Sequence, residues 1–202
     1  MTSDPHLACS FCGQMNPSVQ AVVSRGNPHA KLMLIGEAPG AREDELAKPF
    51  VGRSGQTLER LMESVGLNCD QDVYICNVVK FRPPKNRRPT RQEIALSFPW
   101  LQQQIELVDP ALIVLAGSTA VEAILGIRGG ISKLRGHWQD WQGRWVMPLF
   151  HPAYLLRNPS QAEGAPIALT KSDLLQVRQR LNRINQQAVV PVLGTARCQR
   201  KS

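Results

Sequence analysis

The sequence predicts an α/β protein, a three-layer α/β/α sandwich around a short, mostly parallel sheet of four strands. Short apolar runs end at Gly or Asn, as buried parallel strands do where they meet a loop. Segments with apolar residues at helical spacing alternate with these runs, which is the order typical of a parallel sheet with helices on both faces. The chain has 202 residues, 43% of them apolar, which is enough for one domain with a buried core.

Four strands are expected. "KLMLIG" and "ALIVLAG" are apolar runs that end at Gly, and "DVYICNVV" is rich in β-branched and aromatic residues. The fourth strand is the second arm of a hairpin around Gln142-Gly143, and it leads directly into His151. The first three strands are expected at residues 31–36, 72–79 and 111–117.

Four helices are expected between and after these strands, at residues 54–67, 89–108, 118–125 and 171–185. Gly66 is a stop signal for the first of them. Thr90 and Glu93 form a capping box at the start of the second, in which Pro99 predicts a kink or break. We expect residues 1–185 to form a single domain and residues 186–202 to form a basic, disordered tail.

The charge pattern favours a polyanionic partner. The formal charge is +8 and the pI is near 9.7, and six of the twelve residues in "KFRPPKNRRPTR" (residues 80–91) are Lys or Arg. Three prolines predict a stiff loop whose cations follow phosphates; a solvated loop without a partner is the alternative. The cations expected to contact phosphate are Lys80, Arg82, Lys85, Arg87 and Arg88.

Membrane insertion and secretion are not expected. No apolar run approaches the roughly 18 residues of a membrane span. The N-terminal residues "MTSDPHLACS" lack the basic start and apolar core of a secretory signal. We therefore expect a cytoplasmic protein.

Two loops at the expected strand ends carry chemistry. After residue 36 come the acids Glu37, Glu43 and Asp44, which suit positioning a water or stabilising a developing cation; an ordinary acidic turn is the alternative. After the last strand comes "HPAYLLRNP", in which His151 is fixed by the following proline. Its apolar residues, followed by Arg157, suit a wedge that enters a base stack beside a phosphate, whereas a lone His is more often structural.

These motifs together resemble a known family. "GEAPG", "ED" and "KPFVGRSGQ", then "NVVKFRPPKNRRPT", then "HPAYLLRNP" occur in the order and spacing of the family 4 uracil-DNA glycosylases, the iron–sulfur type. The resemblance extends from about Lys31 to the C-terminal helix. It implies a DNA repair enzyme that flips uracil out of DNA and cleaves the bond between base and sugar.

The resemblance also implies roles for individual residues. Phe50 matches the aromatic that stacks on the flipped base, Asn77 the amide that reads the uracil edge, and His151 the donor to uracil O2. Core packing of Phe50 and a satisfied, buried Asn77 are the structural alternatives. Glu37 and Glu43 match acids linked to the water and the oxocarbenium-like sugar, and the resemblance does not say which acid serves which. Ala38 stands where other glycosylase families carry a catalytic Asp, and Asn86 matches a family position whose role is open. The intercalation loop of the family corresponds to Leu155, Leu156 and Arg157.

The metal ligands of this family are only half present. Its cluster is held by four cysteines, of which Cys9 and Cys12 match the first pair, whereas Phe81 and Ser97 occupy the other two positions. Cys69, Cys76 and Cys198 match no cluster position. We predict that the 4Fe-4S cluster is lost, that Phe81 replaces part of its structural role by packing, and that the chemistry requires no cofactor. A zinc site at Cys9 and Cys12, with His6 and a fourth ligand, is the alternative.

The sequence thus predicts a monofunctional uracil-DNA glycosylase, a monomer that acts on single- or double-stranded DNA and associates with the nucleoid through it. No lysine lies in the proposed site motifs to form a Schiff base, so strand cleavage is not expected. Two alternatives remain: a non-catalytic nucleic-acid-binding relative, and a glycosylase with another base choice such as hypoxanthine or xanthine.

Overall fold

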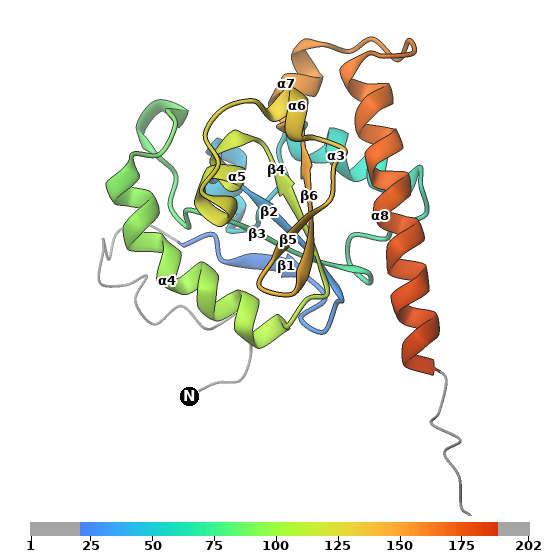
Figure 1. Ribbon diagram of the computed structural model, residues 1–202. Coiled ribbons are helices and arrows are strands. Elements are labelled where there is room, and N and C mark those ends of the chain that lie inside the picture. The colour runs from blue at the N-terminus through green and yellow to red at the C-terminus, as the bar shows by residue number, and fades with distance from the viewer. Residues whose placement is uncertain (1–20, 190–202) are drawn as a thin grey trace, which may run out of the picture.

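The computed structural model describes residues 21–189, which form a six-stranded sheet with helices on both faces (Figure 1). The strand order is β1-β3-β2-β4-β6-β5. The predicted α/β fold class is confirmed. The strands are β1 (Ser24–Gly26), β2 (Leu32–Gly36), β3 (Val73–Asn77), β4 (Leu112–Ala116), β5 (Gln139–Trp141) and β6 (Arg144–Leu149).

The four predicted strands form the parallel centre of this sheet. Strand β2 pairs parallel with β3 and β4, and β4 pairs parallel with β6. β1 and β5 add antiparallel edges to β3 and β6. The sheet is therefore mixed and wider than the four strands predicted. Strand β1 is only three residues long, too short to give an apolar pattern in the sequence.

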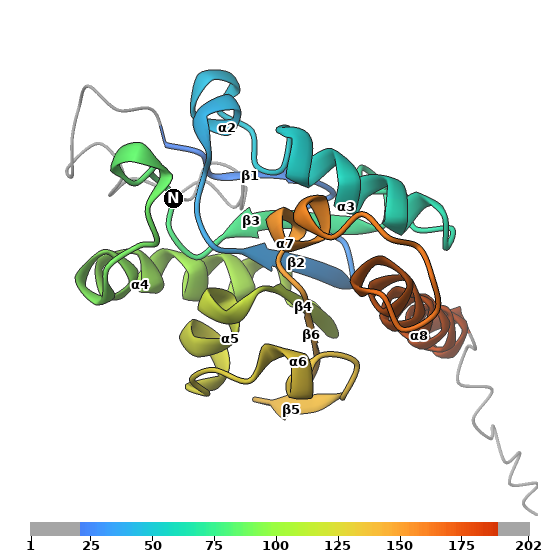
Figure 2. The ribbon, with the colours of Figure 1, turned by 90° about the horizontal axis from the view of Figure 1, so that it is seen from above.

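Each face of the parallel centre is buried under a layer of helices. On one face, Leu32 and Leu34 pack with apolar residues of α3 and α8, and on the other, Met33 and Ile35 pack with those of α4 and α5. Figure 2 shows the two helix layers on either side of the strands. Burial of one aliphatic side chain contributes about 1.5–3 kcal/mol to the free energy of unfolding, so the apolar contacts on each face stabilise the packing of the helices against the sheet. These helices are α3 (Arg53–Glu63), α4 (Arg91–Val108), α5 (Ser118–Leu125) and α8 (Pro166–Val189).

Helix α4 continues through Pro99, so the predicted break does not occur. Thr90 and Glu93 form the expected capping box. Ala95, whose carbonyl loses its helical partner because proline has no N–H, is exposed together with Pro99. Water can therefore satisfy that carbonyl, while burial of Trp100 and Leu101 holds the helix on the sheet directly after the proline.

Helix α8 is longer than predicted at both ends, because it spans Pro166–Val189 rather than residues 171–185. The expected tail from residue 186 therefore begins too early, and residues 186–189 are helical. The rest of the expected tail, residues 190–202, lies outside the described residues. Cys9 and Cys12 also lie outside them.

The predicted hairpin is present, with its turn at Gln142 and Gly143. Both residues have positive φ, at 51° and 74°, which is the geometry of a type I′ turn. The remaining helical elements are the short helices α2 (Ala41–Leu46), α6 (Ile131–Leu134) and α7 (Pro152–Arg157), and the 3₁₀ turn η1 (Pro84–Asn86).

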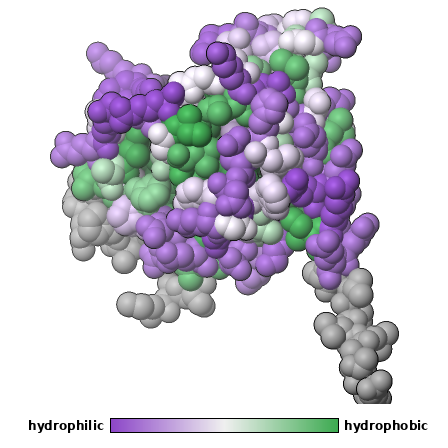
Figure 3. All heavy atoms as spheres, in the orientation of Figure 1, coloured by the Kyte–Doolittle hydropathy of each residue, from purple (hydrophilic) through white to green (hydrophobic). Residues whose placement is uncertain are grey.

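Hydrophilic residues cover most of the face shown in Figure 3, with apolar residues gathered in smaller patches among them. Within the described chain, no helix is both long enough and apolar enough to cross a membrane.

Candidate active site

Loops from the carboxyl ends of the central strands enclose a pocket of about 260 Å³. Gly36 pairs with Asn77 at the ends of β2 and β3, and Ala116 pairs with Leu149 at the ends of β4 and β6. Parallel strands end at one edge of a sheet, so the residues that follow them lie together. All residues predicted to be catalytic or substrate-binding line this pocket: Glu37, Ala38, Glu43, Phe50, Asn77, Asn86 and His151.

An aromatic ring and an amide meet at the end of β2. A Cβ added to Gly36 would lie 2.4 Å from both Phe50 Cζ and Asn77 Oδ1. Only glycine leaves room for both side chains here. Phe50 is 9% exposed and Asn77 is 2% exposed, so each presents little more than the surface that faces the pocket. A flat ring face beside a buried amide suits a planar base with hydrogen-bonding edges.

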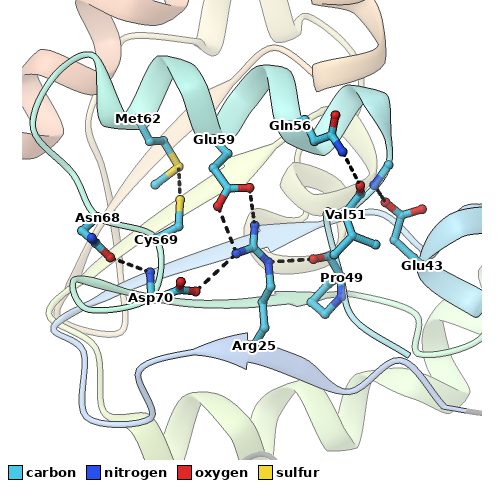
Figure 4. A network of polar contacts seen from close by, with 11 residues as sticks. Arg25, Glu43, Pro49, Val51, Gln56, Glu59, Met62, Asn68, Cys69 and Asp70 are labelled. Carbon is cyan, nitrogen blue, oxygen red and sulfur yellow. Dashed lines mark hydrogen bonds and ion pairs between the residues drawn. The ribbon is translucent and has the colours of Figure 1, made fainter. Parts of the chain in front are cut away.

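The backbone of Phe50 is held in an unfavourable conformation. Its φ is +57°, a region that costs a non-glycine residue about 1–3 kcal/mol and persists only where the surroundings enforce it. In β1, Arg25 donates through Nε to Pro49 O at 2.9 Å and pairs with Glu59 of α3 (Figure 4). A Cβ on Gly55 would lie 2.2 Å from Phe50 O, so the first turn of α3 packs directly against this backbone.

The Glu43 carboxylate connects two loops through hydrogen bonds. Its Oε2 accepts from Gly40 N–H at 3.1 Å and its Oε1 from Gly52 N–H at 2.7 Å. The side chain is 9% exposed. Both carboxylate oxygens are therefore committed to the backbone, and they join the loop after β2 to the loop that carries Phe50.

His151 lies at the N-cap of α7, where its Nδ1 accepts from Ala153 N–H at 3.2 Å. This bond leaves Nε2 as the nitrogen that carries the proton in the neutral ring. Burial lowers the pKa of His151; the charge of Glu37 opposes this, and the charge of Arg157 adds to it. The ring is thus a neutral N–H donor at the pocket. Gly117 lets it approach, because a Cβ there would lie 2.9 Å from the His151 ring.

Glu37 is oriented from α5. Thr119, 1% exposed, donates its hydroxyl to Glu37 Oε2 and accepts from Arg88 Nε at 3.0 Å. The other oxygen of Glu37, Oε1, has no hydrogen-bond partner in residues 21–189, although Glu37 lines the pocket. Glu37 and Glu43 therefore differ in kind, since Glu37 keeps one oxygen for a molecule in the pocket.

The prediction that Lys80 contacts DNA is wrong. Lys80 is fully buried, and its Nζ donates to Asn77 O at 2.6 Å and to Gln104 Oε1. The chain after β3 stays on the sheet, because Val78 N–H donates to Gly36 O and Val79 N–H to Glu37 O. This path turns the Lys80 side chain inward, toward α4, where burial lowers its pKa.

The other cations of the predicted basic loop lie at the surface, and most of them contact acceptors. Arg82 donates to Asn86 Oδ1 at 2.7 Å, Arg87 pairs with Glu93 at 2.7 Å, and Arg88 pairs with Glu122 at 2.8 Å. Arg87 also lines the pocket. Lys85 is exposed, with a positive φ of 53°, and it forms no ion pair within the described residues.

The segment predicted as an intercalation loop is the short helix α7, because Pro152 fits the first position of a helix. Leu155 is fully buried, so it is not available as a wedge. Tyr154 and Leu156 are 38% and 37% exposed, and Arg157 is exposed beside them. The exposed apolar side chains of α7 are thus one residue on either side of Leu155.

The described residues do not fit a four-thiolate cluster. Phe81 lies against Trp100, with ring centroids 6.4 Å apart. Ser97 is fully buried, and its Oγ has no hydrogen-bond partner in the described part of the chain. A phenyl ring cannot ligate iron, and iron–sulfur clusters are ordinarily held by Cys thiolates. Between residues 21 and 189, no group of three or more His, Cys, Asp or Glu side chains is arranged to hold a metal ion.

The two described cysteines are core residues. Burial raises the pKa of Cys69 to about 12 and also raises that of Cys76. Neither Cys69 nor Cys76 belongs to a group of three or more potential ligands arranged to hold a metal ion in the described part of the chain, so neither takes the place of the missing pair.

Sequence reasoning missed the residues that support the site. Thr119, Arg25 and Gln104 contact Glu37, the Phe50 loop and Lys80 from distant elements. Thr119 is the second residue after the predicted strand at residues 111–117, and this closeness to a strand end is the one available signal. The sequence contains no pattern that marks Arg25 or Gln104 as residues that support the site.

Comparisons with known proteins agree with this geometry. Residues 23–194 match the family described as the Uracil DNA glycosylase superfamily. The chain is 44% identical over 154 residues to a type-4 uracil-DNA glycosylase of Thermotoga maritima, covering 75% of this chain and 80% of that protein. Proteins of the same name from Sulfurisphaera tokodaii and Saccharolobus solfataricus are each 38% identical, covering 76% and 79% of this chain and 74% and 77% of theirs. The chain therefore belongs to the type-4 family of the uracil-DNA glycosylase superfamily.

Proposed function

We propose that this protein is a monofunctional uracil-DNA glycosylase that hydrolyses the N-glycosidic bond of deoxyuridine in DNA and leaves an abasic site. The observation that carries this function is the pocket at the strand ends, where Phe50, Asn77, His151 and Glu37 meet. It unites a stacking surface, an amide, a neutral N–H donor and a carboxylate. Enzymes that act on a flipped base hold it by stacking and by hydrogen bonds to its edge, and the N–H donor and the carboxylate can act on the departing base and on the sugar.

Base recognition rests on Phe50 and Asn77. The Phe50 ring offers a face for stacking, and the Asn77 amide offers one donor and one acceptor, which suit uracil O4 and N3–H. Cytosine presents the opposite pattern at these positions. Because Asn77 is almost completely buried, a base that fails to match it would leave a buried polar group unpaired, at about 1–3 kcal/mol.

Bond cleavage rests on His151 and Glu37. As the bond between sugar C1′ and uracil N1 breaks, its electron pair moves onto the base, and the His151 Nε2–H donates to O2. A donor of this kind typically contributes about 2.7–4 kcal/mol in the transition state. The Glu37 carboxylate stabilises the oxocarbenium-like sugar and orients the water that adds its oxygen to C1′. The proton that this water loses balances the proton that the uracil anion takes up, so neutral uracil and an abasic sugar are the products.

Glu43 acts by holding the pocket together rather than by contacting the reacting atoms. Its two bonds to Gly40 and Gly52 keep the Phe50 loop against the loop after β2. Lys80 does not line the pocket and donates to Asn77 O, so it orients Asn77 and does not attack the sugar. A hydrolytic, monofunctional reaction is consistent with both placements.

DNA contacts surround the pocket mouth. Lys85, Arg87 and Arg157 are exposed cations at this edge, suited to phosphates. Leu156 and Tyr154 on α7 are the exposed apolar side chains suited to fill the space of a flipped base. We propose that the protein acts in the cytoplasm as a monomer, as one domain.

We propose that the hydrolysis requires no cofactor. With Phe81 and Ser97 at two positions of the family's cluster, we propose that the 4Fe-4S cluster is not formed. Packing of Phe81 on Trp100 replaces part of its structural contribution. The family's cluster pair, Cys9 and Cys12, is then a remnant.

A release assay tests the function. Oligonucleotides carrying uracil, hypoxanthine, xanthine or thymine, single- and double-stranded, are incubated with the protein and the freed bases are measured. Uracil release without strand cleavage is expected. Binding of DNA without release of any base would favour a non-catalytic relative, and preferential release of hypoxanthine or xanthine would favour another base choice.

A further inference from the structure

Two residues outside the pocket lining form a hydrogen-bonded chain that ends at Glu37: Thr119 contacts Glu37, and Arg88 contacts Thr119. Thr119 is in the first turn of α5, and Arg88 is in the loop after η1. Neither lines the pocket of Glu37 and His151. The three residues are far apart in sequence: Thr119 is 82 positions from Glu37, and Arg88 is 31 positions from Thr119.

The direction of the hydrogen bonds is fixed by chemistry. A guanidinium can only donate, so Thr119 Oγ1 accepts from Arg88 Nε at 3.0 Å. The single hydroxyl hydrogen of Thr119 is then left for Glu37 Oε2, to which it donates. The bonds form a chain in one direction, from a cation through a hydroxyl to a carboxylate. In a buried setting such a chain polarises each member and strengthens its bonds.

The outer end of the chain is also held. Arg88 Nη2 pairs with Glu122 Oε2 at 2.8 Å, and Arg128 Nε pairs with Glu122 Oε1 at 3.0 Å. Glu122 is three residues after Thr119, one turn along α5. The same helix therefore positions both the hydroxyl and the carboxylate that fixes Arg88.

We propose that Thr119 and Arg88 are positioning residues, which form a relay that holds Glu37 Oε2 and so directs Oε1 toward the water that attacks the sugar. This proposal rests on the function proposed above. It assigns Arg88, predicted from the sequence to bind phosphate, a role inside the protein: two of its three guanidinium nitrogens are committed to Thr119 and Glu122.

The relay predicts an effect on the chemical step and not on DNA affinity. A hydrogen bond donated to a charged group is worth about 1.5–3 kcal/mol, so Thr119→Val should lower the single-turnover rate of uracil release by about 10- to 100-fold. Thr119→Ser keeps the hydroxyl and should restore most of the rate. The dissociation constant for uracil-containing DNA should be unchanged in both variants.

A surface pair tests the relay without touching the core. Arg88 and Arg128 both pair with Glu122, with side chains 54% and 65% exposed, but only Arg88 reaches Thr119. Arg88→Gln should lower the single-turnover rate, whereas Arg128→Gln, which removes the same charge beside the same carboxylate, should leave it unchanged. The salt dependence of DNA binding should be the same for both variants.

The outcomes are distinct. If the wild type releases uracil and the Thr119→Val and Arg88→Gln variants are equally active, the relay is wrong but the proposed function stands. A Thr119→Ser variant as slow as Thr119→Val would overturn it too, because the hydroxyl would then not be the group that matters. A rate loss in Arg88→Gln that disappears at saturating protein would show a phosphate contact and contradict the relay. A wild type that releases no uracil would overturn the proposed function and the relay with it.

Discussion

At the scale of single residues, the environment distinguishes two similar acidic side chains. Glu37 and Glu43 are both acids after β2, yet Glu43 gives both oxygens to backbone N–H groups, whereas Glu37 gives one oxygen to Thr119. The sequence predicts both as catalytic and cannot separate them, because the partners of Glu37 come from α5 and those of Glu43 from two loops. Only the fold divides their roles.

The burial of His151 predicts a pH dependence of stability. Its pKa is lowered in the folded protein, so as pH falls below about 6.5 the unfolded chain binds this proton first. The free energy of unfolding should therefore decrease as pH falls from about 6.5 toward the lowered pKa, and His151 should contribute nothing to the slope above that range.

Urea unfolding at a series of pH values measures this slope. His151→Asn, which can still cap α7, should show a flatter decrease than wild type, and His29→Asn, at an exposed position outside the pocket, is the matched control. Equal slopes in wild type and His151→Asn would mean that the folded protein does not disfavour the charged ring.

We predict that replacing Asn77 weakens recognition of the base. Asn77→Ala removes the amide that faces the pocket while leaving the backbone carbonyl that holds Lys80. Each of the two lost hydrogen bonds to the base is worth about 0.5–1.5 kcal/mol, so single-turnover uracil release should fall by about 5- to 150-fold. Affinity for undamaged DNA should stay the same. A variant that releases uracil at the wild-type rate would show that another group reads the base.

At the scale of elements, strands and long helices could be predicted well, and short elements could not. The parallel strands β2, β3 and β4 and the helix α5 leave clear apolar patterns, and the structure places them as expected. Strand β1 and helix α7 are only three and six residues long, too short to show a period. The inward turn of Lys80 depends on Gln104 of α4, a contact that no local pattern encodes.

We predict different effects for alanine substitutions of two adjacent leucines of α7, one on stability and one on uracil release. Leu155 is fully buried and Leu156 is 37% exposed. Leu155→Ala should destabilise the protein by about 2–5 kcal/mol, because it leaves a cavity in the core. Leu156→Ala should leave the melting temperature unchanged but slow uracil release from duplex DNA more than from single strands, since only the duplex needs a wedge to hold the base out. Melting curves and release assays on both substrates measure the two effects. A stable Leu155→Ala with the duplex defect would reverse this assignment.

At the scale of the whole molecule, the sheet assembles the site, and two positions of the family's cluster lie outside the pocket lining. The pocket lies where four parallel strands end, and the residues that line it come from their loops. Phe81 and Ser97, which occupy two positions of the family's cluster, do not line the pocket. Loss of the cluster is therefore compatible with a complete set of base-handling residues.

Metal analysis of the purified protein tests this separation. We expect no stoichiometric iron or acid-labile sulfide and no cluster absorbance near about 400 nm, because iron–sulfur clusters ordinarily require four Cys thiolates. Chelator treatment should leave uracil release unchanged. Near-stoichiometric iron and sulfide would contradict the proposed loss, and zinc alone would point to a site at Cys9 and Cys12.

The central claim is that the pocket hydrolyses the glycosidic bond of deoxyuridine with Glu37 orienting the water. Single-turnover uracil release by wild type and by Glu37→Gln tests it most directly, with Glu45→Gln, an exposed acid of α2, as the matched control. The account predicts rapid release by wild type and Glu45→Gln, and a decrease of about 100-fold or more in Glu37→Gln with unchanged DNA affinity. A Glu37→Gln variant that releases uracil as fast as the wild type would contradict it.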